Sequence, residues 1–459
     1  MLLTKDKSFY KSLFLLAIPI ALQNFVTFCV GLCDNVMIGV LGDTAISGVY
    51  MGNQVQTLLQ LFSGGIEGAI LVLAAQYWGK GDVKSIKRIV SLGLRFTVVF
   101  GVALSTVCIL APRWVISLFT DDPAVCASGA EYLKIVAFSY VFFCLTQALI
   151  AAMRSVETAR IGLYVSIVSL VINAALNYIL IFGHFGAPAL GIKGAAIATL
   201  IARIAECAVI LLYVLIFDKK LLFKIRDLFV TDKNLLRDFL KYGAPIIGGQ
   251  LVWAVNMLSN SAIMGRQSAV GVVAALSVAN TLHNLAYVAM NGMASAVGII
   301  TGKTIGRGEE ELMREYAKTT QVIFLALGLV TGITLRLIRD PYISIYNISP
   351  EAIGQARSLI NVISVTIIGT CYQCACLFGL VKSGGDISFV FKNDCIFVFL
   401  IVLPSALIAT RLGAAPWIVF ACLKCDQILK CFVAAVKINR FKWMKNLTRG
   451  GTKEQKTLE

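Results

Sequence analysis

Twelve long apolar segments follow one another along this chain of 459 residues. Each is close to or longer than the roughly 20 residues that an α-helix needs to cross a bilayer. Because backbone groups in lipid must be hydrogen-bonded within the protein, such segments cross membranes as helices. We expect the spans at residues 13–40, 53–78, 89–111, 131–152, 161–183, 194–217, 242–266, 274–302, 319–338, 355–380, 388–410 and 415–437. The sequence therefore predicts an all-α, multi-pass protein of the inner or plasma membrane.

Charge is scarce, which excludes a soluble globule. Charged residues make up 14% of the chain and apolar residues 58%, whereas about 25% of a soluble protein is charged. The net charge of +16 would suggest a nucleic-acid partner in a soluble protein. In a membrane protein the position of the basic residues matters more, and we expect no nucleic-acid partner.

The basic residues indicate the orientation of the spans. Twelve spans put both termini on one side, and 29 of the 41 Lys and Arg residues fall on that side. The opposite loops hold 6. Because cytoplasmic loops are enriched in Lys and Arg, we expect both termini and the charged loop 218–241 in the cytoplasm.

The two halves of the chain repeat each other. Pro19 precedes Gly39 by 20 residues, and Pro245 precedes Gly265 by the same distance, an offset of 226 between the halves. Gly65 matches Gly292 at an offset of 227. Six spans in each half make this a parallel repeat of two pseudo-symmetric six-helix bundles, as in transporters with a substrate cavity between the bundles. The expected parts are an N-terminal lobe at 1–217, a linker loop at 218–241, a C-terminal lobe at 242–437 and a basic tail at 438–459.

Several motifs resemble those of the multidrug and toxic compound extrusion (MATE) transporters of bacteria. They are L-A-I-P-I at 16–20, C-D-N-V-M-I-G-V-L-G at 33–42, A-A-Q-Y-W-G-K-G-D at 74–82, M-R-S-V-E-T at 153–158, N-A-A-L-N-Y-I-L-I-F-G at 173–183, G-I-K-G-A-A-I-A-T at 191–199 and V-K-S-G-G-D at 381–386. The resemblance covers essentially the whole chain. It implies twelve helices in two lobes, and export of organic, often cationic, compounds by alternating access in antiport with Na⁺ or H⁺. We expect a monomer in the bilayer with a small organic substrate, no cofactor and no catalytic residues.

Asp34 is the strongest candidate for coupling, because an ionisable group inside a membrane is costly. It lies about six residues, roughly 9 Å, from the outer end of the first span. Asn177, Asn173 one turn below it and Thr199 are expected at similar depth in two other spans. Oxygen ligands of this kind suit Na⁺, and a desolvated carboxylate could instead take a proton.

The resemblance implies that these four positions form the cation or proton site of the N-terminal lobe. Relatives often carry Asp where Asn177 stands, so mechanisms that need two carboxylates are in doubt here. The alternative for Asp34 is a hydrogen bond that packs helices. In the second half, Asn260 stands opposite Asp34 and Ser405 opposite Asn177, so no equivalent carboxylate site is expected there.

Other polar residues inside the spans are secondary candidates. Glu67 is either a second coupling or substrate-binding acid or an interhelical hydrogen-bonding group. Arg203 and Glu206 are expected to form a buried structural pair, and Lys424, Asp426 and Lys430 to pair internally. Candidate residues of a substrate cavity are Asn53, Gln54, Gln250, Asn256, Asn280, His283 and Tyr287, with helix packing as their alternative role.

Two other classes of function stay open. One is a flippase of lipid-linked precursors with a related fold, which should have a more cationic cavity. The other is a membrane enzyme or a channel. An enzyme would need a clustered set of catalytic residues, which the sequence does not show, and a channel would not need two matched bundles. The chain has no P-loop, so ATP does not drive it directly. The closely spaced cysteines lie in apolar spans without nearby His, so no metal site other than the possible Na⁺ site is expected.

Overall fold

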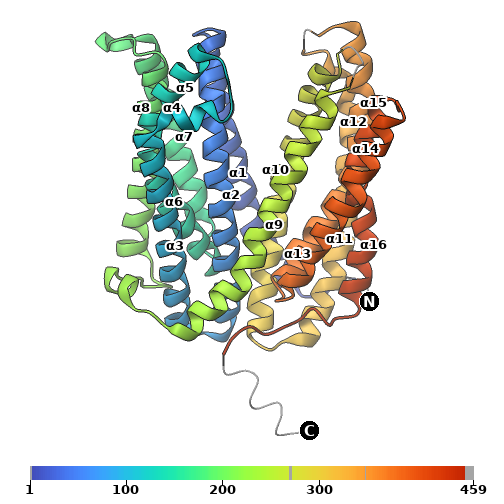
Figure 1. The fold of residues 1–459 in the computed structure, drawn as a ribbon. Coiled ribbons are helices and arrows are strands. Elements are labelled where there is room, and N and C mark those ends of the chain that lie inside the picture. Colours follow the sequence, from blue (N-terminus) through green and yellow to red (C-terminus); the bar gives the residue numbers. More distant parts are fainter. Residues whose placement is uncertain (1–2, 268–270, 347, 450–459) are drawn as a thin grey trace, which may run out of the picture. The chain divides into compact units, whose positions relative to one another are not determined.

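The computed structural model describes residues 3–267, 271–346 and 348–449, and every regular element in these ranges is a helix (Figure 1). Residues 450–459 of the expected basic tail lie outside the described residues. Packing divides the chain into two compact units. One is Leu22–Ile247, and the other joins Met1–Ala21 to Gly248–Glu459.

The unit Leu22–Ile247 is built around α2. This long helix packs against α3, α5 and α6, while α7 packs against α8. The unit holds most of α1 (Lys7–Gly39), α2 (Asp43–Lys80), α3 (Val83–Leu110), α4 (Pro112–Ser117), α5 (Pro123–Val136), α6 (Ser139–Ser155), α7 (Arg160–Phe182), η1 (His184–Gly186), α8 (Ile192–Leu212), η2 (Tyr213–Phe217), η3 (Ile225–Phe229) and the start of α9 (Lys233–Gly265).

The second unit is built around α12. It packs against α10, α11, α15 and α16. The unit holds the rest of α9, α10 (Val272–Gly306), α11 (Glu310–Ile343), α12 (Pro350–Gln373), η4 (Cys374–Lys382), α13 (Ile387–Ile396), η5 (Phe397–Val402), α14 (Leu403–Arg411), α15 (Pro416–Leu423) and α16 (Asp426–Asn439).

The predicted all-α membrane fold is confirmed. In the described part of the chain nine helices are long and apolar enough to span a bilayer, and the bent pair α5–α6 makes a tenth. The remaining two predicted segments, 242–266 and 415–437, fall on α9 and on α15 followed by α16. Every predicted segment is thus helical.

Two of the predicted spans are broken. The span expected at 131–152 is formed by α5 and α6, which meet at an angle of 54°. α5 begins eight residues earlier than expected because the Asp122 side chain accepts a hydrogen bond from the Ala124 backbone N–H (2.8 Å) and Pro123 occupies the first helical position. The last span is interrupted at Lys424 and Cys425, between α15 and α16.

Helices α1 and α9 each contribute to both units, and each contains a proline. The unit boundary follows Ala21, two residues after Pro19, and follows Ile247, two residues after Pro245. These boundaries are separated by the same 226 residues as the sequence repeat. This grouping places residues 1–21 with the C-terminal half of the chain and residues 242–247 with the N-terminal half. The predicted lobe boundaries, 1–217 and 242–437, lie elsewhere and stay a prediction.

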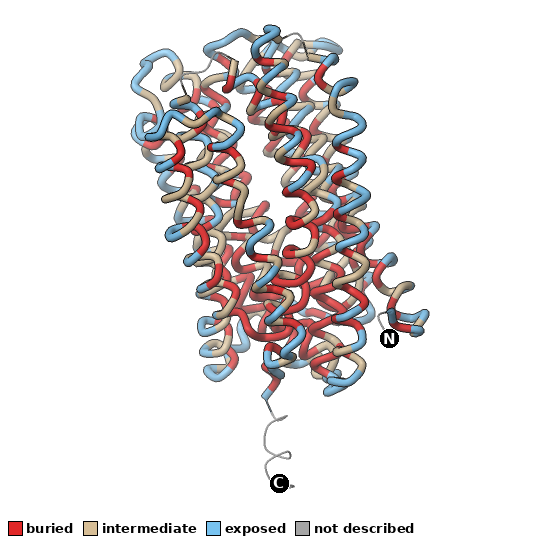
Figure 2. The backbone as a smooth tube through the Cα atoms, turned by 90° about the vertical axis from the view of Figure 1, so that its right-hand side faces the viewer, coloured by how far each residue is buried: buried red, intermediate tan, exposed pale blue. Residues whose placement is uncertain are grey.

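The repeat extends to the way in which these helices pack. A Cβ atom on Gly65 of α2 would lie 2.9 Å from the Ile247 Cα of α9, and one on Gly292 of α10 would lie 2.7 Å from the Ala21 Cα of α1. Each glycine therefore permits a close approach between helices. Buried residues crowd the stretches of α2 and α10 that follow these glycines (Figure 2).

Candidate functional site

The structure brings together Asp34, Asn177 and Asn173, three of the four predicted coupling residues. The Asn177 amide nitrogen Nδ2 donates to Asp34 Oδ1 (2.5 Å) and to Asn173 Oδ1 (3.1 Å). Both asparagines are buried on α7, one helical turn apart, and Asp34 lies near the end of α1. The hydrogen bonds join two helices through one carboxylate.

The carbonyl oxygen of the Asn177 amide is left without a partner. Asn177 Oδ1 is buried and accepts no hydrogen bond in the described part of the chain. A charged carboxylate only accepts hydrogen bonds, so Asn177 must present its NH₂ group to Asp34 and turn its oxygen away. A buried acceptor without a partner costs free energy, and a bound cation or proton donor would satisfy it. The residues present therefore fit a small cation.

Thr199, the fourth predicted residue, is connected to this group through Tyr132. Tyr132 on α5 is buried and lies close enough to Thr199 and Asp34 to interact with both. Its hydroxyl also donates to Asn53 Oδ1 on α2 (3.4 Å). The candidate site is thus bordered by α1, α2, α5, α7 and α8. Asn53, which was expected in the substrate cavity, lies next to this site.

Arg203 stands beside the site, but its charge is already compensated. Its Nη1 atom donates to both carboxylate oxygens of Glu206 (2.8 and 3.1 Å), and the guanidinium lies 5.0 Å from the centre of the Phe143 ring. Arg203 also interacts electrostatically with Asp34. The pair is neutral as a whole, so the negative charge of Asp34 remains available to a cation.

Glu67 lies in a second polar group of the same unit. It is half-buried on α2 and interacts electrostatically with Arg154. Arg154 Nη2 donates to Gln23 Oε1 on α1 (2.8 Å), at the point where α1 enters this unit. The structure therefore connects Glu67 with α1, and its role in coupling stays a prediction.

The remaining predicted substrate residues are divided between the units. Gln54 lies with Asn53 on α2, whereas Gln250, Asn256, Asn280, His283 and Tyr287 lie on α9 and α10 of the other unit. Asn256 Oδ1 and His283 Nδ1 are buried without hydrogen-bond partners among the described residues. Such atoms can bind polar groups of a ligand, and their role in substrate binding stays a prediction.

The charges of the last span form a buried ion cluster that also includes Asp394. Lys430 Nζ lies 2.8 Å from Asp394 Oδ1 on α13 and 3.1 Å from Asp426 Oδ2 on α16. Gln427 Nε2 donates to the other Asp426 oxygen (3.0 Å). The expected pairing is present between Lys430 and Asp426, and Asp394 extends it to the preceding span. Lys424 makes no ion pair within 4.0 Å among the described residues, and its Nζ lies 5.7 Å from the centre of the Phe420 ring.

Lys430→Met is expected to destabilise the protein by about 3–5 kcal/mol, because two carboxylates would remain buried without their cation. Thermal unfolding of the purified protein, monitored by the labelling of buried cysteine thiols as they become exposed, measures this loss as a lower Tm. The control is Lys392→Met, which removes an exposed lysine of α13. Replacing Asp394 and Asp426 by Asn in the same variant should restore much of the stability. Equal melting of Lys430→Met and the control would contradict a stabilising cluster.

Sequence reasoning missed two residues at these sites. Tyr132 lies in an apolar run whose pattern gives no sign of a polar contact. The sequence gives Asp394 no partner, because Lys430 lies 36 positions away and only the fold brings the two side chains together. A carboxylate on one span with a lysine on the next was the available signal.

The sequence is similar to bacterial multidrug resistance proteins over most of its length. The MatE family model matches residues 19–179 and 245–408. A probable multidrug resistance protein NorM of Agrobacterium fabrum is 26% identical over 370 residues, which cover 80% of this chain and 78% of that protein. The multidrug resistance protein MdtK of Edwardsiella ictaluri is 25% identical and covers 82% of this chain and 80% of its own length.

Solved structures share the fold. A crystal structure of a mutant of the Vibrio cholerae MATE transporter VcmN matches with a TM-score of 0.86 and 17% identity, over 96% of this chain and 98% of that chain. A MOP superfamily transporter from Pyrococcus furiosus matches with a TM-score of 0.85 and 17% identity, over 96% and 99%. Because the family model matches well over half of its residues, this chain belongs to the MatE family and is a bacterial membrane transporter, not an enzyme.

Proposed function

We propose that this protein exports organic cations in antiport with H⁺ or Na⁺, and that the coupling cation binds at Asp34, Asn173, Asn177 and Thr199. The observation that carries the proposal is the Asn177 amide, which bridges Asp34 and Asn173 while its own oxygen stays buried and unpaired. The names of the multidrug resistance relatives support an organic substrate.

Binding of a cation would change the hydrogen bonds between α1 and α7. While Asp34 is charged, Asn177 donates to it. A protonated Asp34 becomes a donor, and the Asn177 amide can then rotate to accept with Oδ1. A sodium ion would instead draw the oxygens of Asp34, Asn177 and Thr199 toward itself. Either event acts on α1, which contributes residues to both units.

The proposed setting is the plasma membrane with both termini in the cytoplasm. The excess of Lys and Arg on the side of the termini supports this orientation. One chain contains both halves of the repeat, so we take the monomer as the transporting unit.

Efflux from proteoliposomes tests the function. The purified protein is reconstituted with ethidium inside, and inward gradients of H⁺ and of Na⁺ are imposed separately. We expect one of the two gradients to accelerate efflux, and the responding ion identifies the coupling cation. Collapse of that gradient with an ionophore should return efflux to the rate of protein-free vesicles. An efflux rate that depends on neither gradient would contradict antiport.

A further inference from the structure

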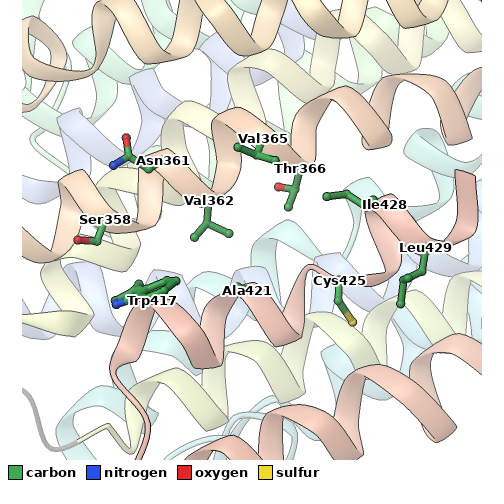
Figure 3. A pocket seen from close by; sticks show the side chains of 10 residues that line it. All are labelled: Ser358, Asn361, Val362, Val365, Thr366, Trp417, Ala421, Cys425, Ile428 and Leu429. Atoms are coloured by element: carbon green, nitrogen blue, oxygen red, sulfur yellow. The ribbon is translucent and has the colours of Figure 1, made fainter.

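A cavity of about 690 Å³ lies in the unit that contains the C-terminus, between α12 and the broken helix α15–α16. Residues on both sides line it, among them Asn361 and Val365 of α12 and Trp417, Ile428 and Leu429 of α15 and α16 (Figure 3). Val365, Trp417 and Leu429 are themselves exposed. In a membrane these exposed apolar side chains face lipid, so the cavity opens to the bilayer. Its volume is that of a site for a drug-sized molecule or a lipid chain.

One end of the cavity is polar and bordered by positive charge. Asn361 lines the cavity, and its Oδ1 accepts a hydrogen bond from Arg339 Nη1 on α11 (2.8 Å). Arg339 Nη2 lies 2.7 Å from Asp340 Oδ2, and Arg357 Nε lies 2.9 Å from Asp340 Oδ1. Two guanidinium groups share a single carboxylate, which leaves one positive charge in excess.

The charged end lies where a membrane surface is expected. Arg339 stands near the end of α11 and Arg357 in the second turn of α12, so both flank the turn between two spans. Trp417 is the second residue of α15, a position typical of aromatic side chains at the membrane interface. From Trp417 to Leu429 the broken helix descends roughly 18 Å at 1.5 Å per residue, about the depth of one leaflet.

We propose that this cavity binds a phospholipid with an anionic headgroup, from the leaflet opposite the chain termini. The phosphate lies at Arg339 and Arg357, and one acyl chain follows the cavity past Val365 to Leu429. Charge selects the headgroup, because Asp340 neutralises only one of the two arginines. The apolar lining accepts the chain without selecting it.

Quenching of Trp417 fluorescence by brominated lipids tests the proposal. The full chain is reconstituted in mixtures containing brominated phosphatidylglycerol or brominated phosphatidylcholine, and the share of Trp417 is the difference between the protein and Trp417→Phe. We expect half-maximal quenching at about fivefold lower fraction of phosphatidylglycerol, given the usual contribution of a basic residue to anionic lipid binding. Equal quenching by the two lipids would overturn the proposal.

Variants separate the headgroup contact from the chain contact. Arg357→Gln and Arg339→Gln should each abolish the preference for phosphatidylglycerol, whereas Arg336→Gln, an exposed arginine of α11 with the same change of charge, should keep it. Val365→Phe, at an exposed position, should fill the cavity and weaken quenching by both lipids. If Arg339→Gln does not fold, Arg357→Gln decides, because its side chain is 54% exposed. A preference that survives Arg357→Gln would contradict the assigned headgroup site.

Discussion

Asp34→Asn is expected to reduce gradient-driven export by roughly tenfold to a hundredfold, the range of a typical coupling free energy between two bound species. Asparagine has the shape of aspartate, so it can still hydrogen-bond to Asn177, but it carries no charge to attract a cation and no site for a coupling proton. The buried Arg203–Glu206 pair is untouched, so the fold should survive. The measurement is ethidium efflux from proteoliposomes under the gradient that drives the unmodified protein.

The matched control is Asp43→Asn, the same chemical change at an exposed residue in the first turn of α2. This variant should export within about twofold of the unmodified protein, as expected for a surface substitution. If Asp34→Asn keeps the full gradient-driven rate, Asp34 is a helix-packing residue, and the coupling site lies elsewhere.

Gly65→Val and Gly292→Val are each expected to lower the stability of the protein, because they place new atoms where two helices approach closely. A Cβ at Gly65 would lie 2.6 Å from Ile247 Cγ1, and a Cβ at Gly292 would lie 2.7 Å from the backbone N and Cα of Ala21. The backbone of α9 or α1 must shift to admit it. Overpacking of this kind costs about 1–3 kcal/mol or more, which should appear as a lower Tm and a lower yield of folded protein.

Two glycines of α1 and α9, the helices that Gly292 and Gly65 approach, supply the controls. Gly31 in α1 and Gly249 in α9 have open space around a built Cβ. Gly31→Val and Gly249→Val should therefore change stability by less than about 1 kcal/mol, the scale of helix propensity. Equal loss in all four variants would mean that the valine itself, and not the close approach of α1 and α9, is responsible.

Much of the fold follows from the sequence, because a span needs only a long apolar run. The length and hydropathy of a run do not predict where the helix breaks within the span. The break between α5 and α6 lies inside an apolar run. The interruption between α15 and α16 lies beside the charged residues Lys424 and Asp426, which the sequence alone does not distinguish from a charged pair inside an unbroken span. The repeat showed Pro19 and Pro245 at equivalent positions, but only packing reveals that the chain changes units just after each of them.

Part of the candidate site could also be predicted from the sequence. Counting residues from the ends of spans placed Asp34 and Asn177 at one depth, and the structure joins them by a hydrogen bond. Depth alone carries no information about which helices are neighbours. For that reason Tyr132 and the contact of Lys430 with Asp394 were not predicted.

Equilibrium binding of an organic cation to the purified protein tests the central claim most directly. Affinity for tetraphenylphosphonium is measured by calorimetry while pH and Na⁺ concentration are varied separately. Since antiport requires that the coupling cation and the substrate weaken each other's binding, affinity should fall either with falling pH or with rising Na⁺. In Asp34→Asn that dependence should vanish while tetraphenylphosphonium still binds. An Asp34→Asn variant that keeps the same dependence would contradict the assignment of the coupling site to Asp34.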